Sequence, residues 1–162
     1  MKKYELTSET KVINGVKLHR IKALNSFGNI YEGDLGGWIE SEQNLSQDGN
    51  AWVEGNATVR GNATVSENAI VCDNAIVSGN ATVRGNAKVR RKEDFIVFKN
   101  WWSSGRYFTW TRSNNKWDVG CFYGSGEELI AKAYKDSAKS GREYERVVKY
   151  VESILKEENN NK

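Results

Sequence analysis

The sequence predicts a β-solenoid followed by a small α+β domain, and three observations support this fold class. Valine recurs every six residues from Val53 to Val89, and an alanine stands two positions before each valine. An asparagine precedes each alanine, so Asn-Ala-x-Val is the repeated unit. A period of six fits neither an amphipathic helix nor a simple meander, and it indicates stacked coils of short strands and tight corners. After residue 91 the repeat stops and aromatic residues become frequent.

Residues 1–38 are predicted to form an N-terminal β cap. The pair Asn14-Gly15 stands between the β-branched runs Val12-Ile13 and Val16-Lys17-Leu18, which favours a hairpin with a type I′ turn. A cap is required because an open solenoid end exposes apolar core and unpaired strand edges.

Residues 39–91 are predicted to form the parallel β-helix. In the unit Asn56–Gly61, strand alternation points Ala57 and Val59 inward, and the following glycine turns the corner. Three units close a triangular coil of eighteen residues. Residues eighteen apart should therefore stack, with valine on valine inside and asparagine amides bonded to one another at the corners.

Three large apolar side chains occupy outward positions of this region, namely Trp52, Ile70 and Ile76. Scattered exposed apolar residues are common on soluble proteins, but these three gather near one corner of the predicted coil. About three coils make a short solenoid, which argues for help from caps or from oligomerisation. We therefore expect the three residues to form an interface between subunits.

Residues 92–162 are predicted to form an α+β domain of βββαα order. Three β-rich runs cover Phe95–Trp102, Arg106–Arg112 and Lys116–Phe122, and Ser, Asn and Gly separate them as turns. A first helix should begin near Ser125, with two glutamates in its first turn, and end before Gly141. A second helix should carry the apolar residues that follow at helical spacing.

The aromatic residues of this domain have two interpretations. Most must fill its core, because a small sheet under two helices needs large side chains to bury enough area. Trp101 and Trp102 are adjacent, so in a strand they point to opposite faces and one should be exposed. With Arg106 and Arg112 they form a candidate binding site, suited to a stacked base with its phosphate or to a protein hot spot.

Basic residues cluster on the last coil and the junction that follows it. They are Arg84, Lys88, Arg90, Arg91 and Lys92. A charged end that blocks strand pairing is one explanation. The functional alternative is a rim that binds anions, for which Arg90 and Arg91 are the candidate residues.

Several segments resemble a known family. They are Leu18–Leu24, Glu32–Glu40, Asn44-Leu45-Ser46 and the Asn-Ala-x-Val units. Together they resemble the hexapeptide-repeat left-handed β-helix proteins of bacteria and their phages, which are often described as transferases on fold alone. The segment Gly120–Gly124, followed by Glu127-Glu128-Leu129, resembles a small domain of unknown role that follows such repeats in phage proteins. The resemblance implies left-handed coils, a homotrimer and a phage or prophage origin, and it brings no catalytic residues.

Acyl transfer from a thioester is the best-known activity of left-handed β-helices. Such enzymes typically need a histidine as general base. The one histidine here, His19, lies outside the repeats and is more simply a strand residue of the cap. No catalytic residue, metal-ligand cluster or cofactor motif is evident, so we assign none.

Composition limits the partners. The formal net charge is +3, with 24 basic and 21 acidic residues interspersed, which gives no strong nucleic-acid signal. No apolar run is long enough to span a membrane, and Met1–Glu5 lacks the apolar stretch of a signal peptide. Cys72 and Cys121 have no metal-like spacing and should stay reduced, so we expect a cytoplasmic protein of a bacterial host.

These observations lead to one main hypothesis and two alternatives. The main hypothesis is a non-enzymatic, phage-type accessory binding protein, a trimer that displays the aromatic-rich domain. Its partner would be a host protein or a small nucleotide, and its use would be to inhibit a host defence system. The alternatives are an acyltransferase-like enzyme and a structural scaffold.

Overall fold

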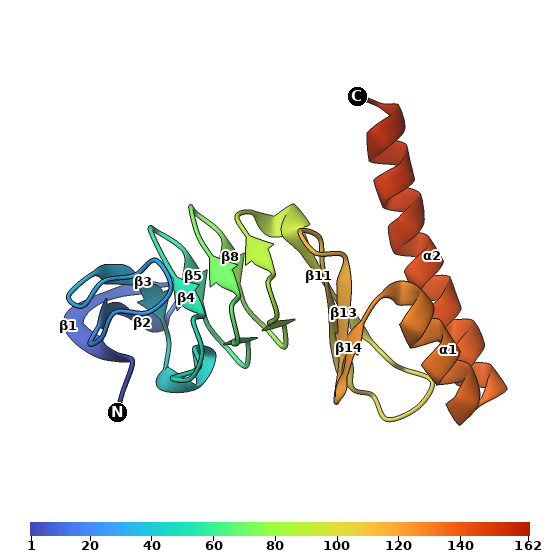
Figure 1. Cartoon of the computed structure of the whole chain (residues 1–162), viewed down its shortest axis with the longest axis horizontal. Helices are drawn as coiled ribbons and strands as arrows, with labels where there is room; N and C mark the ends of the chain where they lie inside the picture. Colours follow the sequence, from blue (N-terminus) through green and yellow to red (C-terminus); the bar gives the residue numbers. More distant parts are fainter.

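The computed structural model describes all 162 residues, and the elements follow one another along a long axis (Figure 1). The strands of the first part are β1 (Tyr4–Ile13), β2 (Val16–Ala23), β3 (Leu35–Ile39), β4 (Trp52–Val53), β5 (Thr58–Val59), β6 (Thr64–Val65), β7 (Ile70–Val71), β8 (Ile76–Val77), β9 (Thr82–Val83) and β10 (Lys88–Val89). The second part holds β11 (Phe95–Lys99), β12 (Tyr107–Thr111), β13 (Lys116–Val119), β14 (Phe122–Gly124), α1 (Gly126–Asp136) and α2 (Ala138–Asn160). Two short 3-10 helices cover Glu42–Asn44 and Lys92–Asp94.

The strands of the repeat pair in parallel at a separation of eighteen residues, as the period predicts. Ile70 pairs with Trp52 on one side and with Lys88 on the other. The corner asparagines bond across the same separation, with Asn50 Nδ2 donating to Asn68 Oδ1 at 3.2 Å. The valine and alanine rows are buried in one continuous core.

The predicted fold class, a β-solenoid formed by a short left-handed parallel β-helix with an N-terminal β cap and a small βββαα domain after it, is wrong. The chain forms four small sheets, namely a mixed sheet in the order β1-β2-β3-β5-β8, parallel sheets β10-β7-β4 and β6-β9, and an antiparallel sheet β11-β12-β13-β14. Each repeat contributes only two strand residues, so each strand is short, although backbone hydrogen bonds between stacked repeats continue at corner residues such as Asn56 and Asn62. The N-terminal hairpin joins a sheet of the repeat, because β2 pairs antiparallel with β3, which pairs in parallel with β5. The boundary of the predicted cap at residue 38 stays a prediction.

The hairpin of β1 and β2 turns at the predicted pair. Asn14 and Gly15 both have positive φ values, 51° and 81°, as a type I′ turn requires. The N-terminal segment then packs over the repeat. The ring centroid of Tyr4 lies 6.3 Å from that of Trp52. Phe27, on the loop after β2, has its ring centroid 5.4 Å from that of Trp52.

The second part has four strands before its helices, so the predicted βββαα order is wrong by one strand. The additional strand β14 pairs with β13, since Val119 and Phe122 are register partners across a turn at Gly120. Helix α1 begins after Ser125, whose hydroxyl accepts from the N–H of Glu128. Helix α2 runs well beyond the rest of the molecule (Figure 1). Neither helix is long and apolar enough to cross a membrane.

The antiparallel sheet lies between the end of the repeat and the two helices, with one face toward each. On β11, Phe95 and Val97 pack against the core of the repeat, whereas Ile96 and Phe98 pack against the core under the helices. Strand alternation explains this division, because successive side chains point to opposite faces. The helix face is aromatic, with Phe108, Trp110 and Trp117 buried in it.

Candidate functional site

The face of the antiparallel sheet that meets the repeat carries buried polar side chains beside the apolar Phe95 and Val97. Thr109 and Asp118 lie on it and are buried. The Thr109 hydroxyl accepts a hydrogen bond of 2.9 Å from the N–H of Thr82, which lies on β9 at the open edge of the repeat. Similarly, the Ser113 hydroxyl accepts from the N–H of Lys88 at 2.8 Å. Side-chain oxygens of the second part therefore satisfy strand edges that the last coil leaves unpaired.

An ion pair joins the two parts at this junction. The Nε of Arg84 lies 3.0 Å from Oδ2 of Asp118 without hydrogen-bond alignment, and its Nη1 lies 3.2 Å from Oε1 of Glu67. Burial raises the pKa of Asp118, although the Arg84 guanidinium acts in the opposite direction. Burial also tends to lower the pKa of Arg84, but its two carboxylates more than offset this and raise it. The pair thus holds the sheet against the repeat.

A basic groove lies beside this junction, with a volume of about 590 Å³ and no apolar side chain in its lining. We use the name basic groove for the hollow formed by Asp73, Lys88, Arg90, Arg91, Asp94, Arg112 and Ser113. Four cationic side chains face two carboxylates there, so the groove carries an excess of positive charge. The structure thereby brings together Arg90, Arg91 and Arg112, which the sequence analysis placed in two different candidate sites.

The cationic side chains of the basic groove differ in whether they form ion pairs with carboxylates. Arg112 forms an ion pair with Glu158 of α2 at 2.5 Å. Arg91 lies 3.8 Å from Asp94, whose other oxygen accepts from the N–H of Arg90 at 2.8 Å. The side chains of Lys88 and Arg90 make no ion pair. These two exposed cations are therefore the ones available to an anion.

The predicted aromatic site does not form as one cluster. Trp101 is 66% exposed on the loop after β11, as expected of one member of the pair. Trp102 is half-buried, with its ring 4.9 Å from that of Tyr144. Arg106 and Arg112 stand at opposite ends of β12, about 20 Å apart at ordinary strand rise. The two arginines line different hollows.

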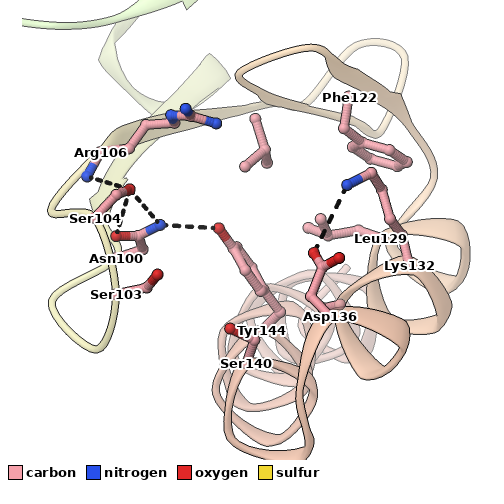
Figure 2. Close-up of a pocket in the computed structure, with 12 residues that line it drawn as sticks. Asn100, Ser103, Ser104, Arg106, Phe122, Leu129, Lys132, Asp136, Ser140 and Tyr144 are labelled. Carbon is pink, nitrogen blue, oxygen red and sulfur yellow. Dashed lines mark hydrogen bonds and ion pairs between the residues drawn. The ribbon is translucent and has the colours of Figure 1, made fainter.

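Arg106 instead borders a pocket of about 360 Å³ in the second part of the molecule (Figure 2). The loop after β11, the turn between β13 and β14, and helices α1 and α2 enclose it. Asn100, Lys132 and Tyr144 supply polar groups, and Leu129 is among the apolar residues of its lining. We call it the module pocket.

The three residues predicted to form a subunit interface have different environments. Trp52 is only 1% exposed, so the expectation that it faces solvent is wrong. Its side chain does leave the repeat core, but Tyr4 and Phe27 cover it. Ile70 is half-buried, and Ile76 is 52% exposed. The interface stays a prediction, and Ile76 is its one fully accessible member.

The histidine and the two cysteines of the chain do not line either hollow. His19 is half-buried on β2, opposite Thr10 and Ile39 in the strand register. Cys72 is buried and Cys121 is exposed, and both are free thiols. No group of three or more His, Cys, Asp or Glu side chains is arranged to hold a metal ion.

The sequence analysis missed several residues of these sites. Asp118 stands between the buried Trp117 and Val119, so strand alternation places it on the opposite face and could have marked a buried charge. No sequence signal marks Asn100 and Tyr144, which are 44 positions apart and joined by a hydrogen bond of 3.3 Å.

The chain matches none of the protein families with which it was compared. It is similar to a protein of Escherichia coli (strain K12) named Uncharacterized acetyltransferase YdcK, with 34% identity over 61 residues. The similarity covers 33% of this chain, and the chain spans about a fifth (19%) of the length of that relative. The similarity thus points to a transferase-like relative, and the predicted phage-type relationship stays a prediction.

Proposed function

We propose that the chain is an acyltransferase-like protein whose basic groove binds the phosphate groups of an acyl-thioester donor such as acetyl-coenzyme A. The observation that carries this proposal is the similarity to a protein named as an acetyltransferase. The alternative of acyl transfer from the sequence analysis is thereby favoured over a purely non-enzymatic role.

The basic groove supports the binding half of this proposal. Acyl-coenzyme A carries a diphosphate and a 3′-phosphate, and arginine and lysine are the side chains that bind such groups most strongly. The exposed, unpaired Lys88 and Arg90 can contact phosphates without first breaking an ion pair. Arg91 is exposed and only loosely paired, so it can add a third contact.

Acyl transfer also requires a group that accepts a proton from the acceptor substrate. His19 is poorly placed for this role within one chain. The sheet order β1-β2-β3-β5-β8 puts β2 three strands away from β8, whereas the basic groove lies beyond the last coil. The groove has two carboxylates. Both oxygens of Asp94 face the neighbouring arginines, whereas the side chain of Asp73 makes no hydrogen bond or ion pair. We therefore assign donor binding to the groove and name Asp73 as the candidate proton acceptor.

Calorimetry with acetyl-coenzyme A tests donor binding. We expect micromolar affinity, a loss of tenfold or more in the double variant Lys88→Gln, Arg90→Gln, and a weaker dependence on salt in that variant. The double variant Lys99→Gln, Arg142→Gln removes two exposed cations elsewhere and should bind as the unmodified chain does. Absence of binding at millimolar donor, or equal binding by the groove variant, would contradict the proposal.

Release of free coenzyme A in the presence of amine and hydroxyl acceptors tests the transfer step. Asp73→Asn should abolish release while donor binding persists, and His19→Ala should leave both unchanged. Loss of release in His19→Ala alone would instead place the proton acceptor on β2.

A non-enzymatic binding protein is the second candidate, and the exposure of Trp101 favours it. An exposed tryptophan is the type of side chain that dominates protein interfaces. Lys139 of α2 lies 5.7 Å from its ring centroid, so a cation and an aromatic face are presented together. In this role the chain would be a phage-type accessory protein that inhibits a host defence system by binding a defence protein or a nucleotide signal.

Native mass spectrometry of the protein purified from its natural host tests this second function. A trimer with a retained host protein or nucleotide that Trp101→Ala fails to retain would support it. A ligand-free monomer would contradict both the trimer and the retained partner.

A further inference from the structure

The module pocket has the shape of a small-molecule site. Its volume of about 360 Å³ falls within the range of ligand pockets, and 5 of its 12 lining residues are hydrophobic, so polar residues form most of the lining. Its apolar part consists of Val119 and Phe122 from the sheet and Leu129 and Ala133 from α1. Figure 2 shows the polar side chains arranged around the same space. A flat or elongated apolar body of a ligand would contact the Phe122 and Leu129 side chains.

Arg106 gives the pocket a free cation. It stands immediately before β12, and its side chain makes no hydrogen bond or ion pair within the chain. Its guanidinium lies against Gly120, where a Cβ atom would overlap Nη1 and force the side chain to move. Gly120 also has a φ of +58°, so both its conformation and the missing side chain keep this position open for the guanidinium.

A hydrogen-bond network orients the donors on the wall of the pocket. The Asn100 amide nitrogen donates to the hydroxyl oxygens of both Tyr144 and Ser104 at 3.3 Å. The N–H of Gly105 in turn donates to Asn100 Oδ1 at 2.8 Å, which fixes the orientation of the amide. Because the Tyr144 oxygen accepts from Asn100, its own O–H is free to donate to a ligand.

Lys132 supplies a second cation across the pocket from Arg106 (Figure 2). Its ammonium lies 3.8 Å from the carboxylate of Asp136, and both side chains are more than half exposed. Exposed pairs of this kind on a helix are weak, so Lys132 can turn toward an anion at small cost.

We propose that the module pocket binds a small organic anion, in which a carboxylate or phosphate head group contacts Arg106 and Lys132 and accepts from the Tyr144 hydroxyl, while an apolar ring lies against Phe122 and Leu129. This site is separate from the basic groove. The groove has no apolar lining and is formed between the end of the repeat and the second part, whereas the module pocket is built from the second part of the chain alone.

Ligand-detected NMR titrations of the full chain test the proposal with benzoate and phenyl phosphate as probes. Benzyl alcohol keeps the ring without the charge, and inorganic phosphate keeps the charge without the ring. We expect at least one of the two aromatic anions to bind, and both controls to bind at least tenfold more weakly. The tighter of the two anions identifies the head group. Binding of benzyl alcohol as tight as that of the anions, or no binding of either anion, would overturn the proposal.

Variants locate the binding. Arg106→Gln should weaken the preferred anion by about tenfold or more, as expected for loss of a charge-assisted hydrogen bond. Its matched control is Arg142→Gln on the exposed surface of α2, which should bind unchanged. The Arg106 side chain holds no other part of the chain, so circular dichroism of the variant should match that of the unmodified protein.

Two further variants keep the test independent of Arg106. Lys132→Gln should weaken the anion by a few-fold, whereas Lys135→Gln on the same helix should not. The groove variant Lys88→Gln, Arg90→Gln should bind the anion normally, which separates this site from donor binding. Equal affinity in Arg106→Gln, Lys132→Gln and the unmodified chain would overturn the assignment.

Discussion

The two parts of the molecule solve the problem of burial in opposite ways. The repeat buries rows of the small side chains alanine and valine, whereas the second part buries the rings of Phe108, Trp110 and Trp117. The parallel strands of the repeat lie about 4.8 Å apart, and the inward alanine and valine side chains of neighbouring strands pack at this spacing. A sheet covered by helices stands further from its partner layer, and large rings are needed to fill the gap.

The repeat and the region where it ends also differ in their polar side chains. The inward rows of the repeat are uniform and hold no titratable group. The polar chemistry gathers where the repeat ends, at Arg84, Asp118 and the basic groove, and again around Asn100 in the module pocket. The regular repeat thus supports the polar groups, and both candidate sites lie at its end or in the part of the chain that follows.

The largest effect should come from the aromatic core. Trp117→Ala should lower the free energy of unfolding by about 3–5 kcal/mol, because it leaves a large cavity under the helices. Urea unfolding followed by circular dichroism measures this. Trp101→Ala makes the same chemical change at a position that is 66% exposed, and it should stay within about 0.5 kcal/mol. Equal losses in the two variants would refute the distinction between core and surface tryptophans.

A pH effect should come next, from a buried lysine on the N-terminal segment. Burial lowers the pKa of Lys3 to about 8 from its ordinary 10.5, against the opposite influence of Asp48. Its ammonium donates to the Ala51 carbonyl at 2.8 Å. The folded chain loses this proton at lower pH than the unfolded chain, so stability should rise between about pH 8 and 10.5, by at most about 3 kcal/mol.

Paired variants isolate this titration from the other lysines and tyrosines. Unfolding free energies measured from pH 7 to 11 should show the rise in the unmodified chain and in Lys2→Met, whose lysine is exposed. Lys3→Met should lack it. A rise of the same size in Lys3→Met would assign the effect to other groups.

The small side chains of the repeat should matter individually less than the rings. Val71→Ala removes two methyl groups from a fully buried row and should cost about 2 kcal/mol. Val12→Ala is the matched change at a position 67% exposed, and it should be nearly neutral. A loss for Val71→Ala as large as that for Trp117→Ala would break the comparison between the two cores.

The smallest effect on stability should come from Ile76, with consequences for assembly instead. Ile76→Lys should change the free energy of unfolding by no more than about 0.5 kcal/mol, because the side chain is exposed. If Ile76 lies in a subunit interface, sedimentation velocity should show an oligomer that this variant dissociates. Ile70→Lys is a poor substitute, since Ile70 packs against the repeat core. A monomer in the unmodified chain would end the interface hypothesis.

Much of the local structure could be predicted because its signals lie within a few residues of one another. The period of six sets the eighteen-residue pairing of Trp52, Ile70 and Lys88, and the Asn14-Gly15 pair sets the first hairpin. Strand alternation placed Phe108 and Trp110 on one buried face. The strand β14 was missed because its three residues, Phe122–Gly124, are too short to show an alternating pattern.

Gly141 was predicted to mark the end of a helix, and it does not. A glycine was expected to lie between the two helices, but it lies within α2, which begins at Ala138 after a cap at Ser137. A Cβ at this glycine would overlap the Tyr134 ring. The glycine is therefore explained by the close packing of α1 against α2, which is a tertiary contact.

The sequence by itself determined which residues stack and alternate, because those relations depend on the chain's own period and on nearest neighbours. The tertiary structure decided which outward residues are covered and which charges meet. Trp52 and Trp101 both stand at positions that the sequence suggests are outward, yet Tyr4 and Phe27 bury only the first. Arg90 and Arg112 share one groove because the second part of the chain docks against the end of the repeat. Contacts between segments distant in the chain depend on how whole layers dock, and no local pattern records that.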